Sequence, residues 1–124
     1  MTILVVDADR ERRGKRAAAL GRAGFEVRTA DSTDAGMAAA AATRFDVVET
    51  RLDLGPGAPC GGLEVAAAAK RRGTQRVLVV APARSPGAFV ARRLGVHLRA
   101  RPLAPDRLAA IASPHARCVG GAPP

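Results

Sequence analysis

Two short runs made only of apolar residues constrain the fold of this chain most. Residues 3–6 read Ile-Leu-Val-Val and end at Asp7, and residues 77–81 read Val-Leu-Val-Val-Ala. A half-exposed strand would alternate apolar and polar residues, whereas an unbroken apolar run predicts a strand that is buried on both faces. Such strands are typical of parallel sheets covered by helices, so we expect an α/β protein.

Candidate strands and helices alternate along the whole chain. Asp9 can cap the first helix, Ser32 or Thr33 can open the second, and Ser85 followed by Pro86 can open the fourth. Five alternations of strand and helix predict a parallel five-stranded sheet with helices on both faces. The expected strands are 3–6, 25–29, 45–50, 76–81 and 96–100, and the expected helices are 10–23, 33–43, 63–72, 86–95 and a short one that ends near 112.

The chain length fits a single domain. With 124 residues it has room for one hydrophobic core. We expect residues 1–112 to form this domain and residues 113–124 to form a disordered tail. Residues 55–62 are rich in Gly and Pro, which break both helix and strand, so they are predicted to be a long flexible loop.

Positive charge dominates the composition. The formal net charge is +9, and Lys15 and Lys70 are the only lysines. Such a charge is compatible with acidic partners, including nucleic acid. However, the chain has no Trp or Tyr and only three scattered Phe, so it lacks the stacking platform of single-strand binders. Nucleic-acid binding is therefore a secondary hypothesis.

Several broad classes of protein do not fit the sequence. The apolar runs are far too short to span a membrane, and the start enters a strand without a basic leader or cleavage site, so we expect a cytoplasmic protein without membrane association. The two Cys and two His lack metal-ligand spacing. No nucleophile and base are paired with a third orienting group. We therefore expect no metal, no cofactor and no enzymatic activity.

Mostly charged residues stand where the predicted strands end. In an open α/β sheet the functional crevice lies at the carboxyl ends of the strands. The positions at these ends are Asp7, Asp9, Arg51, Asp53, Ala81 and Arg101.

The order and spacing of several segments resemble the CheY-like receiver domain of bacterial response regulators. The segments are ILVVDAD, GFEV, FDVV leading into RLDLGPG, LEVA, VLVVA, and an Arg-Pro pair that follows GV. The resemblance spans residues 3–112. It implies a single-domain, doubly wound flavodoxin-like fold with the strand order 2-1-3-4-5.

The resemblance also implies a phosphorylation chemistry from which this chain departs. In the family, an acidic pair after the first strand helps to hold Mg²⁺, an Asp after the third strand accepts the phosphoryl group, a Thr or Ser follows the fourth, and a Lys precedes a proline after the fifth. Here Asp7 matches the first acidic position, but Ala8 occupies the second. Arg51 occupies the acceptor position, Ala81 the hydroxyl position and Arg101 the lysine position. Arginine has no nucleophile and stays protonated, so the resemblance implies a degenerate receiver that is not phosphorylated at residue 51.

Two arrangements of this pocket remain open. In one, Arg51 and Arg101 form charge-assisted hydrogen bonds with Asp7, Asp9 and Asp53, which replace the metal and lock the pocket. In the other, Arg51 reaches solvent and the carboxylates stay hydrated, since exposed ion pairs contribute little.

Glu49 adds a buried carboxylate to the third strand. Alternation places it on the same face as Arg51, so Arg51 is the nearest candidate partner for it. A register shifted by two residues would instead put Glu49 at the acceptor position, and a later loop start would put Asp53 there. Neither alternative restores the metal site.

The first helix is strongly basic. We interpret its charged side chains either as a solvated face or as a basic docking surface. They are Arg10, Arg12, Arg13, Lys15, Arg16 and Arg22.

These observations favour a phosphorylation-independent signalling module that binds a protein partner. The alternatives are a receiver that is still phosphorylated on an unorthodox carboxylate, and a basic nucleic-acid-binding protein whose binding would fall steeply with salt. The resemblance suggests docking through the fourth helix, fifth strand and fifth helix. The residues offered there are Phe89, Val90, Arg92, Arg93, His97 and Arg99.

Overall fold

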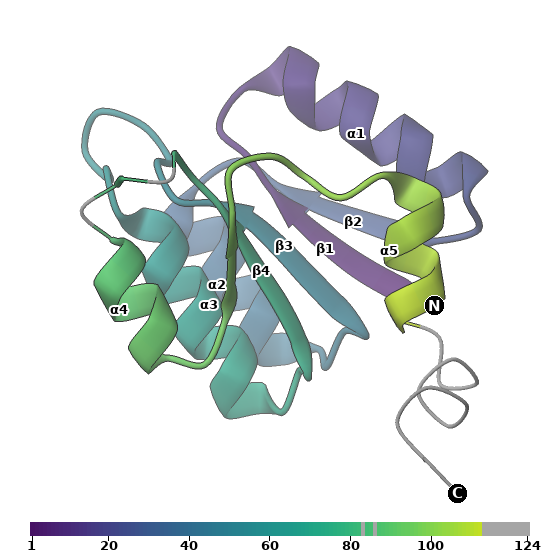
Figure 1. Ribbon diagram of the computed structural model, residues 1–124. Coiled ribbons are helices and arrows are strands. Elements are labelled where there is room, and N and C mark those ends of the chain that lie inside the picture. Colours follow the sequence, from purple (N-terminus) through teal and green to yellow (C-terminus); the bar gives the residue numbers. More distant parts are fainter. Residues whose placement is uncertain (83, 86, 113–124) are drawn as a thin grey trace, which may run out of the picture.

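The computed structural model describes residues 1–82, 84–85 and 87–112. Its elements are β1 (Thr2–Val6), α1 (Arg10–Arg22), β2 (Glu26–Ala30), α2 (Thr33–Ala42), β3 (Val47–Arg51), α3 (Gly61–Arg72), β4 (Arg76–Val80), α4 (Ala88–Arg93), β5 (His97–Arg99) and α5 (Pro105–Ala112). The strands form one parallel sheet in the order β2-β1-β3-β4-β5 (Figure 1). The predicted flavodoxin-like fold and strand order are confirmed.

Helices cover both faces of the sheet (Figure 1). On one face, Leu20 of α1 and Leu108 of α5 are buried against the sheet. On the other, Ala40 of α2, Val65 of α3 and Ala91 of α4 are buried. The strands between them meet apolar side chains on both sides, which explains the unbroken apolar runs in β1 and β4.

The third helix begins earlier than the sequence indicates. Gly61 and Gly62 were expected in the loop, but they form the first turn of α3. A Cβ atom on Gly62 would overlap the carbonyl oxygen of Arg51, and one on Gly61 would overlap the hydroxyl of Thr33. Gly62 therefore allows a close approach of α3 to the end of β3, where its amide donates to the Leu52 carbonyl at 2.9 Å, and Gly61 allows a close approach to the start of α2.

The fourth helix begins later than expected. Its first residue is Ala88 and its N-cap is Gly87, so Ser85 does not cap it, and Pro86 lies outside the described residues. A Cβ atom on Gly87 would press on the side chains of Leu52 and Leu63, so the start of α4 packs closely on the residue that follows β3 and on α3. The expected tail, 113–124, also lies outside the described residues. Within the described part of the chain, no helix has the length and apolar character needed to cross a membrane.

Candidate functional site

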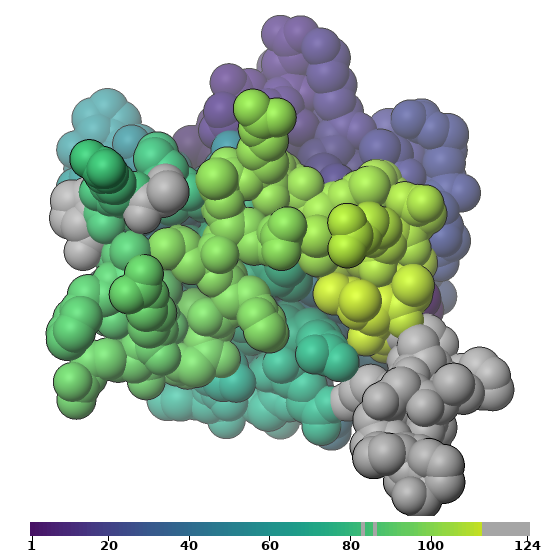
Figure 2. All heavy atoms as spheres, in the orientation of Figure 1, coloured from purple at the N-terminus to yellow at the C-terminus, as the bar shows by residue number. Residues whose placement is uncertain are grey.

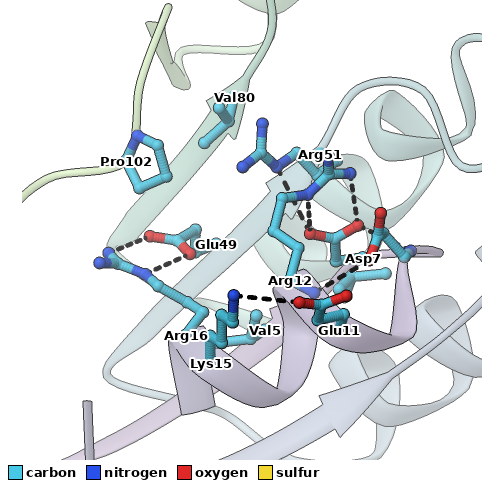
Figure 3. Close-up of a pocket in the computed structure, with 12 residues that line it drawn as sticks. Val5, Asp7, Glu11, Arg12, Lys15, Arg16, Glu49, Arg51, Val80 and Pro102 are labelled. Carbon is cyan, nitrogen blue, oxygen red and sulfur yellow. Dashed lines mark hydrogen bonds and ion pairs between the residues drawn. The ribbon is translucent and has the colours of Figure 1, made fainter. Parts of the chain in front are cut away.

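A cavity of about 490 Å³ opens between α1 and the carboxyl ends of β1, β3 and β4 (Figure 3). This is the edge at which the sequence predicts the functional crevice. The cavity is lined by Val5, Val6, Asp7, Asp9, Glu11, Arg12, Lys15, Arg16, Glu49, Arg51, Val80 and Pro102.

Asp7 is buried at one side of this cavity and is held by Arg12. The Nε atom of Arg12 donates to Oδ2 of Asp7 at 2.6 Å, and its Nη2 atom donates to Oδ1 at 2.7 Å. The amide of Asp9 donates to Oδ1 at 3.0 Å, and Nη1 of Arg13 donates to the Asp7 carbonyl at 2.9 Å. Such a bidentate, charge-assisted pair fixes the carboxylate in one orientation.

The start of α1 explains why Arg12 faces Asp7. Asp9 is the N-cap of this helix, and its Oδ1 atom accepts a hydrogen bond from the Arg12 amide at 2.9 Å. The cap sets the first turn directly after Asp7, so the side chain of Arg12 can fold back over the end of β1. The side chain of Asp9 therefore caps α1.

Opposing effects act on the pKa values of this cluster. Burial alone would raise the pKa of Asp7, but hydrogen bonds from Arg12 and the Asp9 amide, with the charges of Arg12 and Arg51, hold that pKa below its usual value. The hydrogen bond to Asp7 raises the pKa of Arg12. Burial, followed by the positive charge of Arg12, lowers the pKa of Arg51. Asp7 is thus ionised near neutral pH.

A second bidentate pair lies deeper in the cavity. The Nε and Nη2 atoms of Arg16 donate to the two carboxylate oxygens of Glu49 at 2.9 Å and 2.6 Å. The side chain of Arg16 is 14% exposed and that of Glu49 is 6% exposed. The prediction that Arg51 is the partner of Glu49 is therefore wrong. Arg51 is two residues along the same strand, whereas Arg16 approaches from α1 directly above Glu49.

Arg51 is the last residue of β3 and lies beside Asp7. Its Nε atom is 3.5 Å from Oδ2 of Asp7, and its side chain is 26% exposed. It pairs in register with Val80 of β4, next to which its guanidinium group is drawn in Figure 3. Arg51 is thus neither fully locked between carboxylates nor fully in water, and its geometry lies between the two arrangements considered from the sequence.

The remaining predicted pocket residues do not converge on Asp7. Ala8 and Arg101 are exposed and lie outside the lining of the cavity. Asp53 is exposed, and its Oδ1 atom accepts the Gly55 amide at 3.0 Å in a turn. Ala81 is buried beside a neighbouring cavity. Within the described residues, no ion pair joins Arg101 or Asp53 to the pocket, so their predicted share in locking it is wrong.

Sequence reasoning missed the role of the first helix. Arg12 and Arg16 enter the pocket, so the basic character of α1 is neither only a solvated face nor only a docking surface. Their spacing of four residues places both on one side of a helix. A signal was available in that spacing together with Glu49, a buried carboxylate that needs a partner.

The donor atoms of this pocket do not fit the Mg²⁺ ion that the family resemblance implies. Both carboxylate oxygens of Asp7 already accept hydrogen bonds from Arg12, and Ala8 offers no side-chain oxygen. A divalent cation at Asp7 would also face the charge of Arg51. Within the described residues, no group of three or more His, Cys, Asp or Glu side chains could hold a metal.

The candidate docking residues are exposed on α4 and β5. Phe89 is 65% exposed and Val90 is 44% exposed, and the guanidinium carbon of Arg93 lies 5.7 Å from the centre of the Phe89 ring. Figure 2 shows this face, with α4 in green, the chain around β5 in the middle and α5 in yellow. The other proposed members, Arg92, His97 and Arg99, are also exposed.

Comparisons with known proteins support the fold. No protein-family model matches the sequence, and no curated protein is similar to it in sequence. Similar solved structures include a response regulator from Burkholderia pseudomallei with a phosphorylated aspartic acid and a calcium ion (26% identity, TM-score 0.72, covering 97% of this chain and 71% of that one). They also include a response regulator receiver domain from Clostridium thermocellum (23% identity, TM-score 0.71, covering 97% of this chain and 96% of that one). A third is the chemotaxis protein CheY4 of Vibrio cholerae (24% identity, TM-score 0.67, covering 86% of this chain and 91% of that one). The chain has the fold of a CheY-like receiver domain of two-component response regulators.

Proposed function

We propose that this chain is a degenerate receiver that signals through protein contacts, without phosphorylation, without catalytic activity of its own and in the cytoplasm. The observation that carries the proposal is Arg51 at the end of β3, beside Asp7. By its resemblance to receiver domains, the chain would carry the phosphoacceptor aspartate at this position, but it has an arginine there. A guanidinium group cannot attack phosphorus, and its charge disfavours the divalent cation that would neutralise a transferring phosphoryl group.

The other carboxylates of the pocket are poor substitutes for the acceptor. Asp7 and Glu49 are each held by a bidentate arginine, so their oxygens are already engaged. Asp53 is used in a turn and lies outside the cavity that contains Asp7. This geometry favours the proposal over phosphorylation on an unorthodox carboxylate.

The exposed face of α4, β5 and α5 is the proposed docking surface. An exposed phenylalanine beside an exposed valine is costly in water and suits a protein interface. Arg93 lies beside Phe89, and Arg92 and Arg99 are exposed on the same two elements, α4 and β5. We therefore expect a protein partner with an apolar contact point and an acidic rim.

Intact-protein mass spectrometry tests the loss of phosphorylation. The chain is incubated with acetyl phosphate and Mg²⁺, and the Burkholderia regulator, whose structure holds a phosphorylated aspartic acid, serves as the positive control. We expect a phosphoryl adduct on the control and none on this chain. An acyl phosphate on any carboxylate of this chain would refute the proposal.

Affinity capture from the native host tests the docking surface. We expect wild type to retain a partner that Phe89→Ser and Arg92→Ala lose. Arg22→Ala is the matched control, because Arg22 is also an exposed arginine in the last turn of a helix, but on α1. If Arg22→Ala lost the partner to the same extent, the binding would be unspecific attraction between charges. If the captured species were also nucleic acid, the result would favour the nucleic-acid hypothesis.

A further inference from the structure

The guanidinium group of Arg51 has few hydrogen-bond acceptors and little negative charge close to it. A guanidinium carries five N–H donors. Within residues 1–82, 84–85 and 87–112, the Arg51 side chain makes no hydrogen bond, and its nearest carboxylate oxygen is 3.5 Å from Nε. About three quarters of this side chain is shielded from water, since its exposed fraction is 26%. A shielded cation with unused donors favours an anion beside it.

The carboxylates around Arg51 are already committed to other groups. Asp7 accepts two hydrogen bonds from Arg12 and one from the Asp9 amide, and Glu49 is taken by Arg16. Asp9 itself accepts the Arg12 amide as the helix cap. Arg12 and Arg51 therefore share the carboxylate of Asp7. Asp53, which lines the neighbouring cavity, accepts the Gly55 amide and forms no ion pair with either arginine among the described residues.

A second cavity adjoins the same two arginines. It has a volume of about 770 Å³ and shares Arg12, Arg51 and Val80 with the first cavity. Leu52, Ala81 and Pro82 give it an apolar wall. The buried hydroxyl oxygen of Ser85, which also lines it, has no hydrogen-bond partner in the described part of the chain. This space suits an apolar body that carries a polar atom.

We propose that Arg51 and Arg12 bind the oxyanion group of a small organic anion whose apolar body occupies the neighbouring cavity. The inference rests on the proposed function and deepens it, because a reversible ligand would replace phosphorylation as the signal read at the same pocket. The oxyanion is a phosphate ester or a carboxylate, since both match the fork of a guanidinium. The space beside it favours an aromatic or aliphatic body over a bare inorganic ion.

Calorimetric titration with four probes tests the ligand class. Phenyl phosphate and benzoate carry the same ring with different oxyanions, phenol carries the ring alone, and inorganic phosphate carries the anion alone. We expect at least one of the two aromatic anions to bind at one site, more tightly than inorganic phosphate and phenol. The stronger of the two identifies the oxyanion. Failure of both, or equal binding of phenol, would overturn the proposal.

Two variants of equal charge locate the site. Arg51→Gln keeps a polar side chain but removes the charge. We expect it to lower the affinity for the aromatic anion roughly tenfold or more. Arg101→Gln removes the same charge from an exposed position outside both cavities, and we expect it to have little effect. Equal weakening by both variants would show unspecific attraction and would overturn the proposal.

The charge-conserving variant Arg51→Lys separates binding from folding. It lacks the bidentate fork, so we expect weaker binding with the melting temperature of wild type. Unchanged binding would contradict a role for the guanidinium. The titration and the mass-spectrometric test give separate answers. If the chain binds no anion but is not phosphorylated, only the anion proposal fails. If it is phosphorylated but binds the anion, only the proposed loss of phosphorylation fails.

Discussion

The two bidentate ion pairs of the pocket have the same chemistry but different access to water. In the Arg16–Glu49 pair, the side chains are 14% and 6% exposed. In the Arg12–Asp7 pair, they are 47% and 5% exposed. Both arginines come from α1, one helical turn apart. The carboxylates are equally enclosed, so the difference between the pairs lies in how far each arginine remains in solvent.

This difference follows from the positions of the carboxylates along the sheet. Glu49 lies inside β3 and pairs in register with Val5 on one side and Leu78 on the other. Asp7 follows the end of β1, where Arg12 can stay at the rim and Arg51 lies close by. The inner pair therefore depends on one partner, and the outer carboxylate has several. We expect the loss of an arginine to cost far more at the inner pair.

The largest expected effect is that of Arg16→Ala. It leaves Glu49 shielded from water without its partner, which costs about 3 to 5 kcal/mol. In a domain of this size, the melting temperature should fall by roughly ten degrees or more. Urea unfolding measures the loss.

Two further variants define what the Arg16 result means. Lys15→Ala is the neighbouring control, because its pair with Glu11 is exposed on both sides and should leave the unfolding midpoint nearly unchanged. The combined change Arg16→Met with Glu49→Leu should recover most of the loss, since an apolar pair can replace a buried ion pair. A loss under about 1 kcal/mol for Arg16→Ala would remove the contrast between the two pairs.

A smaller effect is expected for Arg12→Ala. Asp7 keeps the Asp9 amide and the nearby charge of Arg51, and Arg12 is about half exposed. The cost should lie between those of exposed and buried pairs, at about 1 to 2 kcal/mol by urea unfolding. A cost equal to that of Arg16→Ala would contradict the argument from solvent access.

The pH dependence of stability tests the outer pair in a second way. The folded-state pKa of Asp7 is lowered, so its contribution is present above the unfolded pKa of about 3.9 and is lost as the pH falls through the folded value. Wild type should therefore lose more stability than Asp7→Asn when the pH falls from 5 towards 2. Chemical unfolding at each pH measures this, and parallel curves for the two proteins would argue against an ionised, paired Asp7.

The effect of Arg51→Ala should be smaller again, under about 1 kcal/mol. Arg51 makes only a 3.5 Å ion pair with Asp7, and Arg12 remains to hold that carboxylate. The double change with Glu49→Ala should be additive within about 0.5 kcal/mol, whereas Arg16→Ala with Glu49→Ala should deviate strongly from additivity. Strong coupling between Arg51 and Glu49 would restore the partner predicted from the sequence.

The smallest expected effect is that of Mg²⁺. A ligand raises the melting temperature only in proportion to its binding, and the oxygens of Asp7 are engaged by Arg12. Millimolar Mg²⁺ should leave the melting temperature unchanged, with NaCl of equal ionic strength as the control. A clear rise that is specific to Mg²⁺ would mean that the cation displaces Arg12 from Asp7.

Sequence by itself determined the fold, because its signals are local. The apolar runs of β1 and β4 report burial on both faces, and capping residues such as Asp9 and Ser32 mark helix starts within a residue. Alternation of the elements then leaves few topologies. The boundaries that were wrong lie at glycines in close tertiary contact, Gly61 with Thr33 of α2 and Gly87 with Leu52 and Leu63. Such packing has no local signature.

Only the tertiary structure decided which arginine meets which carboxylate. Along β3, Arg51 is the charge nearest to Glu49. An i+2 neighbour on a strand lies beside Glu49 in the sheet, whereas a helix docked on the sheet places its side chains directly over Glu49. Arg16, 33 residues away in sequence, therefore takes Glu49, and Arg12 takes Asp7. That choice depends on the position of α1 across the sheet, where Leu20 packs. The spacing of Arg12 and Arg16 indicates only that they share one side of the helix, not which carboxylate each one meets.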